Sequence, residues 1–142
     1  MGAPVLIDDG LVELEVVAIV KNTIQCVVKN EGVVSDHKGV NLPGGHVNLP
    51  YLSEKDRSDI LFGIKNDVDF IAASFVRTAF DVKLIRNLLD ANGGSAVNII
   101  AKIENAEGVA NIDEIIRESD AIMIARGDMG VELPEEEVPI VQ

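Results

Sequence analysis

The chain has 142 residues, of which 47% are hydrophobic and 25% are charged. This length is usual for one domain, and the composition is that of a globular rather than a disordered protein. Twenty-four acidic residues against twelve basic ones give a formal net charge of −12. Such a surface repels nucleic acid and anionic membranes, so neither is expected as a partner.

Targeting and redox features are sparse. No apolar run approaches the roughly 20 residues of a membrane-spanning helix, and the first residues lack the basic region of a signal peptide. The single cysteine, Cys26, has no partner for an internal disulfide. Its apolar neighbours predict a buried, inert thiol. Together these features predict a cytoplasmic protein.

The first part of the chain is predicted to be a small β-meander. Residues 4–35 contain short β-branched runs separated by turn signals at 8–10, 21–22 and 30–32. Within them, VELEV at 12–16 alternates apolar and acidic residues, which is the period of a half-buried antiparallel strand.

The periodicity changes after the Gly- and Pro-containing connector KGVNLPGGHVNLP at 38–50. Ser53 and Asp56 have the spacing of a capping box, which predicts that a helix begins after Ser53. His37 directly precedes this connector and His46 lies in it, nine residues further on. No carboxylate cluster accompanies them, so exposed or capping roles are favoured over zinc binding.

Two further helices are predicted downstream. Thr78 and Asp81 open one of them, whose apolar face is formed by 82, 85, 88 and 89 and which ends at the glycines 93–94. Asn111 with Glu114 caps the next. The last segment, LPEEEVPIVQ, is expected to begin another helix, with the acidic run 135–137 favouring its N-terminus.

Between these helices lie three runs that are apolar on both faces: DVDFIAASFV (67–76), AVNIIAKIE (96–104) and DAIMIARGD (120–128). Alternation of such strands with helices predicts an α/β fold whose parallel strands are covered on both sides. The pattern allows a barrel or an open sheet. A Rossmann fold is disfavoured because SFVRTAFD, after the first run, contains no glycine.

Each run ends in polar residues: Ser74 and Arg77, then Lys102 and Glu104, then Arg126 and Asp128. In α/β barrels the carboxyl ends of the strands carry the chemistry. Lys102 and Glu104 stand two residues apart, so their side chains point to the same side of the strand. The alternative is a structural ion pair, but an ion pair within an apolar strand costs much desolvation energy.

These residue types suit one kind of chemistry. Glu104 and Asp128, from neighbouring strands, would hold a hard divalent cation such as Mg²⁺. Lys102 beside it would neutralise charge developing on a phosphoryl or enolate oxygen. After Gly127 the segment GDMGVELP is expected to open a loop, where free backbone N–H groups at a helix start would bind a carboxylate or phosphate. The pattern thus describes a site for a small phosphorylated acid.

At this point a family resemblance can be stated. The segments NIIAKIENAEGVANIDEII and SDAIMIARGDMGVELPEEEVPIVQ resemble the active-site region of pyruvate kinases. VLIDDGLVELEV, HKGVNLPG, LPYLSEKDRSDILFGI and DFIAASFVR are similar to further segments of that family, in the same order. The resemblance therefore extends over nearly the whole chain.

The resemblance implies a partial (β/α)8 TIM barrel preceded by a small β-meander. Residues 41–142 correspond to the central part of the barrel, about strands 4–6 with their helices. Residues 1–40 correspond to the later part of the β-rich lid domain that the family inserts after the third strand. The implied activity is transfer of the phosphoryl group of phosphoenolpyruvate to ADP, which gives pyruvate and ATP, with Mg²⁺ (or Mn²⁺) and K⁺.

The resemblance also assigns roles to residues. Glu104 and Asp128 would be the metal ligands, and Lys102 would stabilise the phosphoryl group in flight and the enolate. The backbone at Gly127 and Asp128 would hold the substrate carboxylate, and Ser74 matches a polar position at the barrel mouth.

Three further positions are matched less directly. Arg126 corresponds to a residue at the barrel mouth that also makes contacts between subunits. From the lid, Lys38 and Asp9 would face the nucleotide. The resemblance implies a homo-oligomer, since the family is tetrameric.

Much of such an enzyme is not represented in these residues, including the potassium site, the other barrel strands and the C-terminal effector domain. The 142-residue chain alone is therefore expected to be inactive. Its unpaired strand edges leave self-association open. Two alternatives remain: a metal-dependent aldolase of the phosphoenolpyruvate-binding barrel group, and a non-catalytic folding or interaction fragment.

Overall fold

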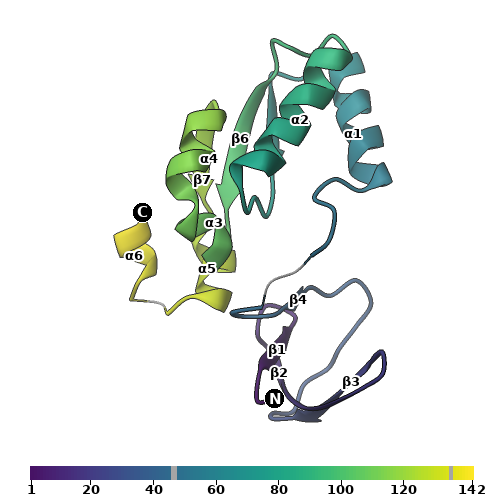
Figure 1. Ribbon diagram of the computed structural model, residues 1–142, viewed down its shortest axis with the longest axis vertical. Helices are drawn as coiled ribbons and strands as arrows, with labels where there is room; N and C mark the ends of the chain where they lie inside the picture. Colours follow the sequence, from purple (N-terminus) through teal and green to yellow (C-terminus); the bar gives the residue numbers. More distant parts are fainter. Residues whose placement is uncertain (46–47, 135) are drawn as a thin grey trace.

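The chain forms two separate β-sheets in the computed structural model, which describes residues 1–45, 48–134 and 136–142 (Figure 1). The first sheet is antiparallel, with strand order β3-β2-β1-β4. Its strands are β1 (Pro4–Ile7), β2 (Val12–Val20), β3 (Thr23–Val28) and β4 (Val40–Asn41). The second sheet is parallel, with order β5-β6-β7, and consists of β5 (Phe70–Ala73), β6 (Asn98–Ile103) and β7 (Ala121–Ile124).

Six helices accompany the parallel sheet in the part of the chain that the structure describes. They are α1 (Glu54–Lys65), α2 (Ala79–Ala91), α3 (Ala106–Ala110), α4 (Ile112–Glu118), α5 (Arg126–Glu132) and α6 (Val138–Val141). The alternation of strand and helix confirms the predicted α/β class and the partial barrel with its parallel strands.

The antiparallel sheet contains the predicted meander and one strand more. β4 pairs with β1, with Leu6 opposite Asn41, so the predicted domain boundary between residues 40 and 41 falls inside β4. The turn between β1 and β2 places Asp8 and Asp9 at φ values of 55°, a left-handed conformation that Asp tolerates better than most residues. Cys26 in β3 is partly exposed rather than buried, because β3 is an edge strand.

Helix α1 begins at the predicted capping box. The Ser53 hydroxyl accepts a hydrogen bond from the Asp56 N–H (3.1 Å), and the Asp56 carboxylate accepts one from the Ser53 N–H (2.8 Å). The Ser53 hydroxyl also donates to this carboxylate (2.6 Å). These hydrogen bonds, from the Ser53 side chain first and its backbone second, hold the pKa of Asp56 below its ordinary value.

The capping box makes the stability of this helix depend on pH. Because the pKa of Asp56 is lower in the folded state, its contribution is complete above the usual carboxyl range of about 4 and is lost as the pH falls below it. We therefore expect Asp56→Asn to lose less unfolding free energy than the wild type between neutral pH and about pH 3. Urea denaturation at the two pH values measures this difference, and equal losses would contradict it.

Helix α2 has the predicted start, face and end. Its first turn is held by Asp81, whose carboxylate accepts a hydrogen bond from the Thr78 N–H (3.1 Å). The side chains of 82, 85 and 89 are buried and that of 88 packs against the same core. Gly93, with a φ of 80°, follows the last turn.

The hydrophobic core lies between the parallel sheet and its helices (Figure 1). Along β6 every second residue is buried: Ile99, Ala101 and Ile103 face the core, which includes side chains from α1, α2 and α4. The opposite face is open, since Phe70 is 57% and Met123 44% exposed. The prediction that these strands are covered on both sides is therefore wrong for the described residues: α1, α2 and α4 contribute to a core on one face, and the other face is open.

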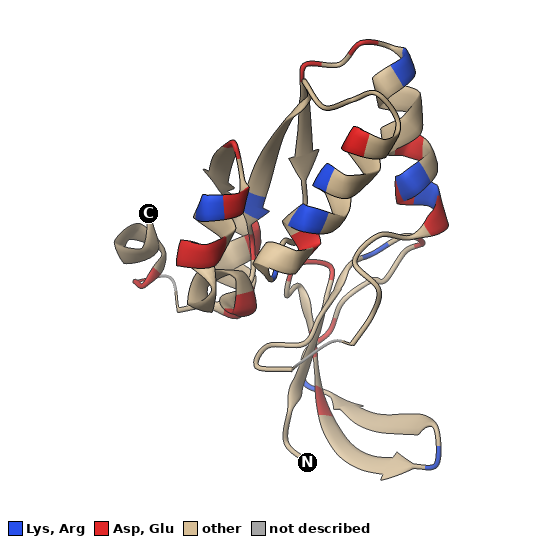
Figure 2. Cartoon of the chain, turned by 45° about the horizontal axis from the view of Figure 1, so that its top comes forward, with Lys and Arg blue, Asp and Glu red and all other residues tan. Residues whose placement is uncertain are grey.

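The surface carries its charges in a mixed arrangement. In Figure 2 the Lys and Arg residues of the helices are interspersed with Asp and Glu rather than gathered in one stripe. In the regions that the structure describes, no helix has the length and apolar character required to cross a membrane. His37 is exposed, as expected, whereas His46 and Glu135 lie outside the described residues.

Candidate active site

The three parallel strands bring their polar ends to one edge of the sheet. Because the strands are parallel, Ser74, Glu104 and α5 all follow the carboxyl end of a strand. The N–H of Ala125 donates to the carbonyl of Ile103 (3.1 Å), so the segments that carry Glu104 and Asp128 leave the sheet side by side. This edge is where α/β barrels bind their ligands.

Lys102 joins two of the predicted site residues. Its Nζ lies 2.5 Å from Glu104 Oε1 and donates a hydrogen bond to Ser74 Oγ (2.9 Å). The lysine side chain is 23% exposed, whereas the glutamate side chain is only 1% exposed. The charge of Lys102 therefore has access to solvent or substrate, while its partner is fixed within the protein.

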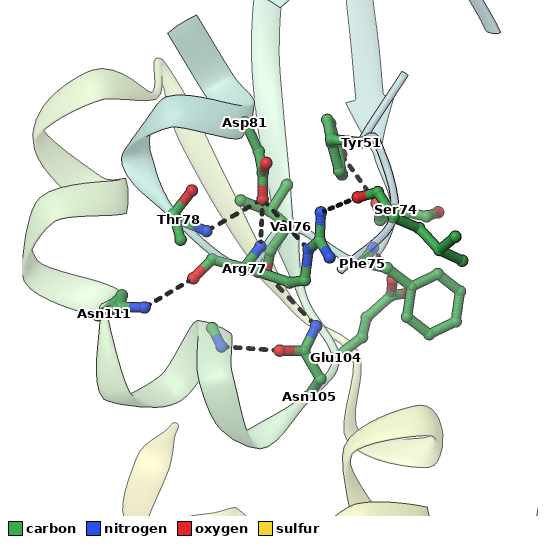
Figure 3. Close-up of polar contacts among 12 residues, drawn as sticks. Tyr51, Ser74, Phe75, Val76, Arg77, Thr78, Asp81, Glu104, Asn105 and Asn111 are labelled. Carbon is green, nitrogen blue, oxygen red and sulfur yellow. Dashed lines mark hydrogen bonds and ion pairs between the residues drawn. The ribbon is translucent and has the colours of Figure 1, made fainter. Parts of the chain in front are cut away.

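Glu104 is held by a backbone donor as well as by Lys102. Its Oε2 accepts a hydrogen bond from the N–H of Phe75 (2.5 Å), which is in the loop after β5 (Figure 3). Phe75 has a φ of 53°, and a bulky residue rarely adopts this left-handed conformation. Strain of this kind persists only where surrounding contacts enforce it, and it is common at functional sites.

The residue after Glu104 anchors the next helix to the same loop. Asn105 is the N-cap of α3, with Oδ1 accepting from the Gly108 N–H (2.7 Å) and Nδ2 donating to the carbonyl of Val76 (3.4 Å). A Cβ on Gly108 would lie 2.6 Å from that carbonyl oxygen, so the close approach requires glycine. The loop after β5 and the start of α3 thus hold each other in place around Glu104.

Asp81 and Asn111 fix the remainder of this loop (Figure 3). Asp81, 4% exposed, accepts from the N–H of Arg77 (3.0 Å) and pairs with its guanidinium (3.6 Å). Asn111 stands at the N-cap of α4, but its side chain does not cap the helix as predicted. Its Nδ2 donates instead to the carbonyl of Arg77 (3.0 Å), and its backbone, with φ −104° and ψ 15°, lacks the extended conformation of a capping residue.

Asp128 lies in the first turn of α5 and is partly buried. The loop predicted after Gly127 is in fact this helix, and the predicted helix start is found at Arg126. The first intrahelical bond runs from the Met129 N–H to the carbonyl of Ala125 (3.0 Å). The N–H groups of Gly127 and Asp128 precede it, at positions where a helix leaves donors without an intrahelical acceptor. Arg126 and Gly127 are exposed.

A cleft of about 1030 Å³ lies between the antiparallel sheet and the carboxyl edge of the parallel sheet. Three predicted site residues, Asp9, Ser74 and Asp128, are part of its lining. Lys102 and Glu104 are not part of this lining; their charged groups contact each other, Ser74 and the loop after β5. The antiparallel sheet therefore contributes one wall of this cleft.

The other predicted lid residue, Lys38, forms an ion pair within the antiparallel sheet. Its Nζ lies 2.9 Å from Asp8 Oδ1, next to Asp9 in sequence. A separate contact joins the antiparallel sheet to α5: Asn41 Nδ2 donates to Glu132 Oε1 (3.4 Å), while Glu132 Oε2 accepts from the N–H of Ala106 (3.3 Å). Glu132 thus connects β4 to the helix that follows Glu104.

The acidic residues of this edge are suited to magnesium. Among the described residues, no group of three or more His, Cys, Asp or Glu side chains could hold a metal ion. A magnesium ion is usually held by one or two carboxylates together with substrate oxygens, so Glu104 and Asp128 are a donor set of the appropriate kind.

Sequence reasoning missed Tyr51, the Phe75 N–H, Asn105 and Glu132. The Tyr51 hydroxyl donates to the carbonyl of Ser74 (2.8 Å). Burial raises the pKa of Tyr51, and the carboxylates of Asp81, Glu104 and Asp56 raise it further, so the hydroxyl remains a donor. Of the four, only Asn105 carried a sequence signal, because Asn is a favoured N-cap residue.

The chain has the features of a segment of an α/β barrel enzyme. Its parallel strands alternate with helices, and acidic and basic side chains lie at the carboxyl ends of the strands. The family model described as "Pyruvate kinase, barrel domain" matches residues 1–142. The chain belongs to the pyruvate kinase family.

Curated pyruvate kinases match the same residues of the chain. The chain is similar to pyruvate kinase of Geobacillus stearothermophilus (59% identical over 100% of this chain and 24% of the relative). It is also similar to pyruvate kinases of Sporosarcina psychrophila (57% identical; 99% of this chain, 24% of the relative) and Clostridium acetobutylicum (53% identical; 99% and 30%). The chain thus spans a quarter to a third of the length of these relatives.

Proposed function

We propose that the protein represented by this chain transfers the phosphoryl group of phosphoenolpyruvate to ADP, giving pyruvate and ATP. The observation that carries this proposal is the pairing of Lys102 with the buried Glu104 at the carboxyl edge of the parallel sheet. The relatives that bear the name pyruvate kinase match this chain over its whole length, which supports the same activity.

Lys102 acts on the group that is transferred. In this reaction the bond between phosphorus and the enol oxygen breaks, and a bond from phosphorus to a terminal phosphate oxygen of ADP forms. The enolate that remains takes up a proton from water at its methylene carbon to give pyruvate. The ammonium group of Lys102 offsets negative charge on the phosphoryl oxygens and then on the enolate oxygen. Ser74 Oγ, which accepts a hydrogen bond from Lys102 Nζ at 2.9 Å, holds that ammonium group at the mouth of the barrel.

Glu104 and Asp128 would hold Mg²⁺ (or Mn²⁺). When bound, the ion supplies positive charge that polarises phosphoryl oxygens. The N–H groups of Gly127 and Asp128, in the first turn of α5, bind the carboxylate of the substrate, and Arg126 contributes positive charge nearby. The family also uses K⁺, whose ligands would come from outside residues 1–142.

In this proposal the antiparallel sheet covers the nucleotide. We assign residues 1–40 to the lid domain and 41–142 to the barrel domain, with Asp9 and Lys38 facing ADP from the lid. Asp9 lines the cleft. Lys38 forms an ion pair with Asp8, so its ammonium group lies beside the turn that contains Asp9. The complete enzyme is a cytoplasmic homo-oligomer.

The activity is tested with the full-length protein that carries this segment. Phosphoenolpyruvate and ADP are supplied with Mg²⁺ and K⁺, and pyruvate and ATP are measured together. Equal amounts of the two products are expected. A parallel assay supplies a hydroxylated keto acid: cleavage of its carbon–carbon bond, with no ATP formed in the first assay, would identify an aldolase. Absence of both reactions would identify a non-catalytic module.

The metal ligands are tested separately from turnover. In the same protein, we expect Glu104→Gln together with Asp128→Asn to weaken Mn²⁺ binding by at least about 100-fold, since loss of even outer-shell partners costs about 10–100-fold. Electron paramagnetic resonance of free Mn²⁺ measures the affinity. The matched control, Asp113→Asn with Glu114→Gln, makes the same charge change at exposed positions of α4 and should keep the wild-type affinity. Unchanged affinity in the first pair would exclude this metal site.

A further inference from the structure

One peptide group at the carboxyl edge is held from both of its ends. The carbonyl oxygen of Ser74 accepts the hydroxyl proton of Tyr51 (2.8 Å), and the N–H of Phe75 donates to Glu104 Oε2 (2.5 Å). These two groups belong to the same peptide bond. Because a peptide bond is planar, fixing the direction of its oxygen also fixes the direction of its N–H.

The backbone conformation at Phe75, on one side of this peptide group, is unfavourable for that residue type. Phe75 has a φ of 53°, which a bulky residue rarely adopts. The hydrogen bonds at the two ends of the peptide are the contacts that hold it there. They also reinforce each other, because a carbonyl that accepts a hydrogen bond makes its own N–H a better donor.

The hydrogen-bonded chain continues into the proposed site. Glu104 is 1% exposed, and each of its oxygens has a partner: Phe75 N–H on Oε2 and Lys102 Nζ on Oε1. Lys102 in turn donates to Ser74 Oγ (2.9 Å), from the residue whose carbonyl Tyr51 holds. A rotation of the Ser74–Phe75 peptide would therefore move the donor to Glu104, and Glu104 is the ion-pair partner of Lys102.

Tyr51 is distant in sequence from the peptide group to which it donates its hydrogen bond. It lies in the segment between β4 and α1, two positions before the capping residue Ser53, and packs partly against the core. Figure 3 shows Tyr51 beside Ser74. The side chain is thus supported on its apolar side and has its hydroxyl aimed at the loop after β5.

We propose that Tyr51 is a positioning residue of the reaction, which orients the Ser74–Phe75 peptide group and through it the Glu104 carboxylate and the Lys102 ammonium group. This inference rests on the proposed phosphoryl transfer. In this role Tyr51 acts through the Ser74–Phe75 peptide group rather than on the reacting atoms. Its effect is on the geometry in which Lys102 meets the phosphoryl group, so it acts on the chemical step more than on substrate binding.

The test is Tyr51→Phe in the full-length protein, a change that keeps the ring and removes only the hydroxyl. We expect kcat to fall about three- to tenfold, which corresponds to the loss of one hydrogen bond, while KM for phosphoenolpyruvate changes less than about twofold. The matched control is Ser119→Ala. It removes another hydroxyl that donates to a backbone carbonyl, that of Ile115 (2.7 Å), and should leave kcat unchanged.

A second measurement does not depend on turnover. Hydrogen-exchange mass spectrometry of the segment that contains Phe75 should show faster exchange in Tyr51→Phe and wild-type exchange in Ser119→Ala. If the wild type transfers no phosphoryl group, the proposed function fails, whereas the exchange result still reports on the clamped peptide. Unchanged kcat in Tyr51→Phe, or a fall matched by Ser119→Ala, overturns the positioning role, as does unchanged exchange at Phe75.

Discussion

Replacing Lys102 with methionine is expected to lower kcat of the full-length protein by about 10³-fold, the order of loss seen when one donor to a developing negative charge is removed. The ammonium group lies 2.5 Å from Glu104 and 2.9 Å from Ser74 Oγ, so it is fixed in place before substrate arrives. Steady-state measurement of ATP formation gives kcat and KM separately. An unchanged kcat with a higher KM would contradict the role in the chemical step.

Methionine at this position also leaves Glu104 as a buried carboxylate without its cation, which destabilises a protein by about 3–5 kcal/mol. Lys102→Arg separates the two effects, because it keeps a positive charge beside Glu104 but replaces a compact ammonium with a planar guanidinium. This variant is expected to fold and still to lose most of its turnover. Lys29→Met is the control: it breaks an exposed ion pair with Glu15 (2.8 Å) in the antiparallel sheet, and should leave kcat intact.

Ile115→Ala is expected to lower the free energy of unfolding by about 2–5 kcal/mol, the range for removing a large buried aliphatic side chain. Ile115 is fully buried in α4, where it belongs to the core that includes side chains of α2 and β6. Loss of its side chain leaves a cavity that the surrounding residues refill only in part. Urea denaturation followed by circular dichroism measures the change.

The neighbouring residue provides a matched control. Ile116 is on the same helix but is 48% exposed, so Ile116→Ala makes the same chemical change without opening a cavity. The control is expected to lose about 1 kcal/mol or less. Equal losses in the two variants would mean that α4 does not pack on the sheet as described.

Much of the fold was predictable because its signals are local. The capping box at Ser53, the apolar face of α2 and the glycines after it each depend on residues within a few positions of one another, and all are present. The pairing of Lys102 with Glu104 was predictable for the same reason, since their spacing alone puts them on one side of a strand.

The parts that could not be predicted depend on contacts between distant residues. Tyr51 donates a hydrogen bond to a carbonyl 23 positions away. The Asn111 side chain does not cap its helix as expected and donates to a carbonyl 34 positions away. The exposure of Phe70 and Met123 likewise depends on which elements pack on the sheet, and the apolar character of a strand does not reveal this. The catalytic, metal-binding and substrate-binding roles assigned to the site residues all stay predictions.

The left-handed backbone at position 75 limits which amino acids that position can accept. The structure uses the main chain of Phe75, whereas its side chain is 50% exposed. Glycine and asparagine adopt such a φ more easily than phenylalanine, so they suit the position. Proline has no N–H to offer the carboxylate, and its ring locks φ near −65°. Sequence change at this position is therefore constrained by backbone chemistry more than by the half-exposed aromatic ring.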